Sequence, residues 1–175
     1  MMWKWILGAA ALPVGAGVLV LAVGAALPRD HVAAVEVVLP AGPAAIAQRI
    51  RNVDAQPRWR PGVKSLQIVE RVRDGVVYVE TSGDGPIRLR LVEERPEAQF
   101  RSTIADPDLP FSGYWLFLIE PEGEGTRLRI EEHGSVSNPL FRFFARFVFG
   151  HDRNIRAYMG DLERAVSAPS AGSSA

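Results

Sequence analysis

The chain contains no cysteine, which excludes disulfides, thiolate nucleophiles and thiolate metal ligands. Its three histidines, His31, His133 and His151, are scattered without metal-ligand spacing. Neither charge is in excess, because 20 Lys and Arg balance 20 Asp and Glu, and this excludes the electrostatic footprint of a nucleic-acid-binding protein. A nucleophile elbow, a phosphate-binding glycine-rich loop and a dinucleotide fingerprint are also absent. The sequence therefore predicts no metal and no cofactor, and no motif by itself names a reaction.

What the chain does contain is an uncharged run over residues 5–27. As a helix this run would reach roughly 34 Å, enough to cross a hydrocarbon core of about 30 Å. It predicts an N-terminal transmembrane anchor over residues 1–28. The alternative is a secretory signal peptide, in which Lys4 is the positive region and residues 24–26 supply a small-residue cleavage site. A short tail before a single span favours a single-pass membrane protein whose domain faces the periplasmic or exoplasmic side.

Residues 29–166 have the length and composition of one globular domain, and residues 167–175 form a small-residue tail that we expect to be disordered. Alternating or β-branched apolar runs separated by turn residues predict strands. These strands are expected at 32–39, 63–71, 76–82, 86–94, 98–106, 111–120 and 126–135. Apolar positions three and four apart predict a helix at 43–52, a short helix or turn at 54–61 and a long helix at 138–166. Because most connections between strands are short, we expect an antiparallel meander.

Alternation also assigns the faces of the expected sheet. Ile87, Leu89 and Leu91 lie on one side of their strand and two arginines lie on the other, so one face of the sheet is apolar and the other is polar and solvent-exposed. The same alternation places Glu132 on the apolar face. A covering helix is required, and residues 138–166 carry an apolar stripe on a helical wheel that also contains His151. The predicted fold class is therefore α+β, with a curved antiparallel sheet of about seven strands, in the order β-α-α-β6-α, around a C-terminal helix.

Four segments carry a resemblance to a known family: 57–63 (PRWRPGV), 109–115 (LPFSGYW), 125–134 (GTRLRIEEHG) and 138–143 (NPLFRF). Over residues 32–166 the chain resembles the SRPBCC superfamily of START-like and polyketide cyclase/dehydrase-like helix-grip domains. It is most similar to membrane-anchored bacterial members of that group. The resemblance implies a cavity for a hydrophobic ligand between sheet and helix, but no particular reaction. Leu116 and Leu118 depart from a wet outer face and suggest a homodimer or membrane contact, to which Phe143 and Phe149 could contribute.

The expected ligand pocket combines aromatic residues, apolar strand and helix positions, and the two polar groups directed inward. Its members are Trp59, Tyr78, Leu89, Ile104, Trp115, Phe117, Ile130, Glu132, Phe144, Val148, His151, Ile155 and Met159. Glu132 and His151 are candidate catalytic residues, because a desolvated carboxylate facing an imidazole can act as an acid–base pair. The alternative is that Glu132 pairs with an arginine at the cavity rim and His151 is a hydrogen-bonded core residue.

Three functions follow from these residues. The first is a membrane-tethered domain that binds or carries a hydrophobic small molecule such as a lipid, a quinone or a polyketide-like ring system. The second is a cofactor-free cyclase or dehydratase that uses Glu132 and His151. The third is a protein-interaction scaffold with a filled core. A cavity between helix and sheet distinguishes the first two functions from the third.

Overall fold

The computed structural model describes residues 15, 17–144, 146–147 and 152–167. Seven strands form its sheet: β1 (Asp30–Leu39), β2 (Ser65–Val72), β3 (Gly75–Ser82), β4 (Gly85–Arg95), β5 (Gln99–Ile104), β6 (Phe111–Glu122) and β7 (Gly125–Val136). Its helices are α2 (Pro43–Arg51), the 3₁₀ helix η1 (Val53–Arg58), α3 (Pro139–Phe144) and α4 (Arg153–Ser167). This confirms the predicted α+β class, the seven strands and the C-terminal helix.

The strands form one antiparallel sheet in the order β1-β7-β6-β5-β4-β3-β2. Short turns join β2 to β3, β3 to β4, β4 to β5 and β6 to β7, whereas the longer segment 105–110 joins β5 to β6. Gly123 takes a positive φ of 57° in the β6–β7 turn, where a side chain on Cβ would be strained. Only β1 pairs far from its sequence neighbours, lying antiparallel to β7 from Asp30 opposite Ser135 to Leu39 opposite Thr126. This pairing brings the first strand of the sheet beside the last one.

Alternation divides the sheet into an inner face, which α2 and α4 cover, and an outer face. On β7, Thr126, Leu128 and Ile130 are buried and point inward, while the arginines between them are half-buried on the outside. α2 begins at Pro43, which suits the first helical turn because it needs no backbone donor there. α4 contributes Ile155, Tyr158, Met159 and Leu162, all buried, at the three- and four-residue spacing of one helical face. These side chains and the inner face form the core.

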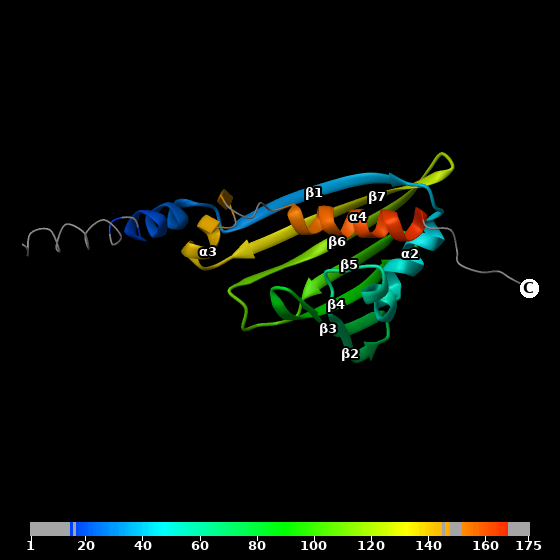
Figure 1. Ribbon diagram of the computed structural model, residues 1–175, viewed down its shortest axis with the longest axis horizontal. Helices are drawn as coiled ribbons and strands as arrows, with labels where there is room; N and C mark the ends of the chain where they lie inside the picture. The colour runs from blue at the N-terminus through cyan, green and yellow to red at the C-terminus, as the bar shows by residue number, and fades with distance from the viewer. Residues whose placement is uncertain (1–14, 16, 145, 148–151, 168–175) are drawn as a thin grey trace, which may run out of the picture.

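The predicted continuous helix over residues 138–166 is replaced by two separate described helices. Figure 1 shows α4 running along the sheet, whereas α3 lies at the end of β7 beside the helical residues 17–26. The α3 side chains Leu140, Phe141 and Phe144 are 38–49% exposed. The wheel that placed them in the same buried stripe as Ile155 assumed one unbroken helix axis, and that assumption fails.

The prediction of a single-pass membrane localisation is contradicted. No helix among the residues that the structure describes is long and apolar enough to cross a membrane. Residues 17–26 are helical. The first half of the expected span, residues 1–14 and 16, falls outside the described residues, as do residues 168–175 of the expected tail.

The described N-terminal helical residues pack on α3. A Cβ atom at Gly24 would lie 2.0 Å from the Pro139 carbonyl oxygen, so the two backbones approach at a position that only glycine permits. Arg142, which is buried, donates a hydrogen bond of 2.8 Å from Nη1 to the Leu27 carbonyl oxygen. These contacts fix the segment that leads into β1.

Candidate functional site

Glu132 is a carboxylate on the inner face of the sheet, as the alternation predicts. It lies directly opposite Trp115 in the β6–β7 register. Trp115 Nε1 donates a hydrogen bond of 2.8 Å to Glu132 Oε2, and His31 Nε2 lies 3.4 Å from Glu132 Oε1. The carboxylate is therefore held at both oxygens, by an indole on one side and an imidazole on the other. We call these three residues the Trp115–Glu132–His31 group.

His31 reaches Glu132 because its ring lies against the backbone of β7. It pairs with Gly134 in the β1–β7 register. A Cβ atom at Gly134 would come within 2.3 Å of His31 Cε1 and 2.5 Å of His31 Nε2, so the imidazole occupies the space that a larger residue would fill. The side chains of His31 and Glu132 are 17% and 21% exposed, so neither is completely buried.

The sequence reasoning missed His31 because it began the first strand at residue 32, whereas β1 begins at Asp30. Extending the alternation of Val35 and Val37 backward by four residues would have placed His31 on the inner face. The predicted partner, His151, falls outside the described residues, and the Glu132–His151 pair stays a prediction. The other prediction was an arginine partner for Glu132. Among the described residues, the groups that hydrogen-bond Glu132 are instead Trp115 and His31.

An aromatic cluster joins the Trp115–Glu132–His31 group to α4. Tyr158 packs edge-on against three rings, with centroid distances of 5.5 Å to Trp59, 5.9 Å to Trp115 and 5.5 Å to Phe117. Its partners come from β6 and from the turn that follows η1. Such edge-to-face pairs each contribute about 0.5–1.5 kcal/mol beyond area burial. Trp115 therefore contacts both the carboxylate of Glu132 and the ring of Tyr158.

A buried ion pair lies beside this cluster. Arg60 donates hydrogen bonds of 2.6 and 3.0 Å to the two oxygens of Glu80 and one of 2.7 Å to Gln56 Oε1. The Arg60 guanidinium carbon also lies 4.9 Å from the centroid of the Tyr158 ring. Because arginine and glutamate neutralise one another, the pair adds directed donors and acceptors to the inner face without net charge.

Both tyrosines of the inner face stay protonated at neutral pH. Burial, followed by the negative charge of Glu80, raises the pKa of Tyr78 to about 12. Burial likewise raises the pKa of Tyr158 above its ordinary value of 10.0. Tyr158 Oη and Trp59 Nε1 are buried atoms with no hydrogen-bond partner.

The structure places the predicted pocket residues in four classes. Tyr78, Phe117, Ile130, Ile155 and Met159 are buried, and Trp59, Leu89, Ile104, Trp115 and Glu132 are half-buried. Phe144 is 38% exposed on α3, and Val148 and His151 fall outside the described residues. The ten residues of the first two classes share the inner face or the elements that cover it. Their role in binding stays a prediction.

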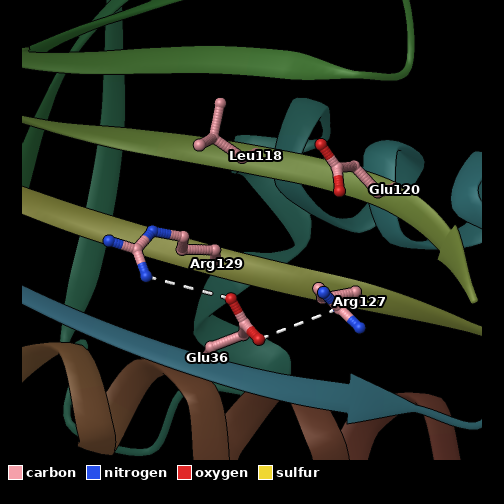
Figure 2. A pocket seen from close by; sticks show the side chains of 5 residues that line it. All are labelled: Glu36, Leu118, Glu120, Arg127 and Arg129. Carbon is pink, nitrogen blue, oxygen red and sulfur yellow. Dashed lines mark ion pairs between the residues drawn. The ribbon is translucent and has the colours of Figure 1, made fainter.

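The outer face carries a different type of surface. Leu116 and Leu118 are half-buried there, between charged neighbours. A depression of about 70 Å³ is lined by Leu118 and by charged side chains of β1, β6 and β7, which Figure 2 shows as sticks. In it, Glu36 lies 3.7 Å from Arg127 and 3.9 Å from Arg129. The depression is smaller than ordinary ligand pockets of about 300–1,000 Å³, and both of its arginines pair with Glu36. A dimer or membrane contact through Leu116 and Leu118 stays a prediction, as does any part in it of Phe143 and of Phe149, which falls outside the described residues.

Known proteins share this architecture. A START superfamily protein from Mycobacterium smegmatis is similar with a TM-score of 0.64 at 20% identity, over 78% of this chain and 97% of that one. A truncated norcoclaurine synthase from Thalictrum flavum has a TM-score of 0.65 at 13% identity, over 80% and 95%. The di-domain ARO/CYC StfQ from the steffimycin biosynthetic pathway has a TM-score of 0.61 at 18% identity, over 78% and 50%. At these identities the similarity shows the fold alone.

The comparison at the level of sequence gives the family. A search of curated proteins finds no match. The model of the family described as polyketide cyclase / dehydrase and lipid transport matches residues 30–167. This match, together with the START-like structural neighbours, confirms the resemblance to the SRPBCC superfamily. Since the matched region is well over half of the chain, the protein belongs to the polyketide cyclase/dehydrase and lipid transport family.

Proposed function

We propose that residues 29–166 form a binding domain for a hydrophobic small molecule, which lies on the inner face of the sheet beside Trp115. The observation that carries this proposal is the Trp115–Glu132–His31 group. It is a carboxylate with fixed orientation, half-buried on an inner face whose buried side chains are mostly apolar. Ligand sites for small molecules combine these features, since apolar walls supply affinity and a few polar groups fix orientation. Membership of the family supports the same class of ligand.

Affinity would come mainly from apolar burial. Covering about 300 Å² of apolar ligand surface contributes roughly 7 kcal/mol before the costs of association are subtracted. Ring systems suit the site best, because Trp59, Trp115, Phe117 and Tyr158 form one aromatic cluster there. A lipid chain, a quinone or a polyketide-like ring system all belong to this class. The hydrogen-bond acceptor of Glu132 favours a ligand that carries a hydroxyl or N–H group.

Titration of the full-length protein with N-phenyl-1-naphthylamine, a neutral fluorescent hydrophobe, tests the proposal. We expect saturable binding at one site per chain. In Trp115→Ala the Kd should be at least tenfold higher, because the indole ring against which the ligand packs is removed. If circular dichroism shows that Trp115→Ala does not fold, Trp115→Phe, which retains an aromatic ring, is titrated in its place. Leu118→Ala is the matched control on the opposite face of the same strand, and its Kd should equal that of the wild type.

Two results would contradict the proposal. The first is the absence of saturable binding, which would favour the scaffold with a filled core. The second is an equal loss of affinity in Trp115→Ala and Leu118→Ala. Native mass spectrometry of the protein purified from its own host complements the titration, because a lipophile that co-purifies in wild type and is lost in Trp115→Ala would identify the ligand.

A second candidate function is acid–base catalysis on the bound molecule. The specific observation that favours it is the 3.4 Å approach of His31 Nε2 to Glu132 Oε1, which supplies the imidazole expected from His151. Such a pair can take a proton from one ligand atom and return a proton at another, as a cyclisation or dehydration requires. Glu132→Gln should then abolish turnover while the Kd of the ligand stays within about threefold. Unchanged turnover in this variant would exclude the catalytic role.

A further inference from the structure

We propose that Tyr158 and Trp59 form a hydrogen-bond-donating subsite for an uncharged oxygen acceptor on the hydrophobic ligand, such as a ketone, quinone or ether oxygen. This inference rests on the proposed function and specifies the chemistry of its ligand. Trp115 links the Tyr158–Trp59 pair to Glu132, since its ring packs against Tyr158 and its Nε1 donates to Glu132. A ligand lying along Trp115 would meet donors at one end and an acceptor at the other.

The first argument is the unused hydrogen-bonding capacity of the pair. Tyr158 is 4% exposed, and its Oη and the Nε1 of Trp59 are both buried without a partner. Among the described residues, Arg142 Nε is the third such side-chain atom, and it lies away from the cluster in α3. Buried polar groups are nearly always hydrogen-bonded, so two unsatisfied donors in one aromatic cluster indicate that something absent from the free chain supplies an acceptor.

The second argument is a comparison of the two indoles that pack against Tyr158. Trp115 Nε1 donates a hydrogen bond of 2.8 Å to Glu132, whereas Trp59 Nε1 has no acceptor. Both oxygens of Glu80 and the amide oxygen of Gln56 accept from Arg60, and none of them accepts from Tyr158 Oη or Trp59 Nε1. The chain therefore does not satisfy the pair from its own neighbouring groups.

The third argument fixes the charge of the ligand group. Tyr158 keeps its proton, so its hydroxyl is a donor at neutral pH. The Arg60–Glu80 pair has no net charge, and a carboxylate or phosphate brought into the cluster would lose its hydration without a free cation in compensation. An uncharged acceptor loses much less hydration free energy when it is buried. A neutral carbonyl or ether oxygen is therefore the group that fits two neutral donors in this surrounding.

Two probes of equal shape test the inference. 2-Acetylnaphthalene and 2-isopropenylnaphthalene differ only in carrying C=O or C=CH₂, so both fill the apolar site and one offers an acceptor. In the full-length wild type we expect the ketone to bind about tenfold tighter than the alkene, measured by quenching of tryptophan fluorescence. In Tyr158→Phe this ratio should fall to within about twofold of unity, while the alkene keeps its wild-type Kd. Trp59→Phe should reduce the ratio in the same direction.

The control and the contrary outcomes separate this inference from the proposed function. Tyr114→Phe removes a tyrosine hydroxyl on the outer face, where the ring stacks on His133, and should leave the ratio unchanged. If both probes bind with equal Kd in the wild type, the subsite is refuted and the hydrophobic site stands. A buried water that satisfies both donors would give this result. If neither probe binds, the proposed function fails, and the subsite fails with it.

A measurement without ligand is an independent test. If Tyr158 Oη lacks a partner in the free protein, Tyr158→Phe removes an unsatisfied buried group and should leave Tm unchanged or raise it by about 1–4 °C. A fall in Tm by several degrees would mean that the hydroxyl is already hydrogen-bonded inside the chain, which overturns the inference.

Discussion

The two ends of the inner face differ in how completely they are covered. At the α4 end, where α2 and α4 lie on the sheet, Leu39, Leu128 and Leu162 are fully buried. At the α3 end, where α3 meets helical residues 17–26, Leu140 and Phe147 are 41% and 59% exposed. The side chains compared at the two ends are all large and apolar. The difference shows that composition does not decide which part of such a face is core, because the placement of the covering helix does.

The Trp115–Glu132–His31 group lies at the boundary between the α4 end and the α3 end of the inner face. Along β7, Leu128 and Ile130 are fully buried under α4, and the next inward residue, Glu132, has a side chain that is 21% exposed. The polar group is thus placed at the boundary of the packed core. This arrangement lets the α4 end supply rigidity while a reachable carboxylate is held at its border, as preorganised binding sites require.

The largest expected effect is on the free energy of unfolding, and it compares Leu162, which is fully buried, with Leu140, which is 41% exposed. Leu162→Ala removes a fully buried side chain from α4 and should lower the free energy of unfolding by about 3 kcal/mol. Leu140→Ala removes a side chain that is already 41% exposed and should cost less than about 1 kcal/mol. Urea denaturation followed by circular dichroism measures both. Equal losses would show that the α3 end is as closely packed as the α4 end.

A smaller effect is expected at the boundary itself. Gly134→Ala would place a Cβ within 2.3 Å of the His31 ring and displace it from Glu132, at a cost of about 1–2 kcal/mol. In the background of His31→Ala this cost should disappear, because the clash is with the ring. Gly62→Ala is the control, since its Cβ would meet nothing within 4 Å. The same cost with and without His31 would show that the clash involves the backbone alone.

The smallest effect is a pH dependence at the α4 end. The hydrogen bond from Arg51 lowers the pKa of Glu93 below its ordinary value of 4.5. A lowered folded-state pKa means that the stabilisation is fully present above pH 4.5 and is lost as the pH falls through the folded-state pKa. The pair is partly exposed, with side-chain accessibilities of 47% and 22%, so its contribution should stay below about 1 kcal/mol.

Arg51→Gln measures that contribution. Its unfolding free energy should lie below that of the wild type at pH 7, and the difference should vanish once Glu93 is protonated in strong acid. Urea denaturation at both pH values gives the comparison. A difference that persists unchanged in acid would assign the effect to packing of the arginine stem instead of the ion pair.

Much of the fold was predictable because local patterns and tertiary structure agree. The strand periods, the turn residues and Pro43 at the start of α2 all point to the elements that form. The inward direction of Glu132 followed from the two-residue period of β7 alone. The family was readable from short segments such as 109–115, and the family model matches the same part of the chain.

The features that escaped prediction depend on long-range packing or on segment ends. His31 was missed because strand boundaries are the least certain part of any sequence pattern, and its approach to Glu132 depends on the pairing of β1 with β7. The exposure of Phe144 could not be foreseen, because a helical wheel contains no information on where a helix axis is interrupted. The unsatisfied atoms of Tyr158 and Trp59 emerge only when neighbouring acceptors are counted in three dimensions.

The central claim is that a hydrophobic molecule binds on the inner face beside Trp115. Nitrogen-15 spectra report on it directly, because the indole N–H signals of Trp59 and Trp115 are separate resonances that site-directed variants can assign. On titration with 2-acetylnaphthalene, both signals should shift saturably and with one common Kd, while the backbone signals of Leu118 and Arg129 stay in place. Shifts confined to the outer face, or indole signals that do not move at saturating ligand, would contradict the account.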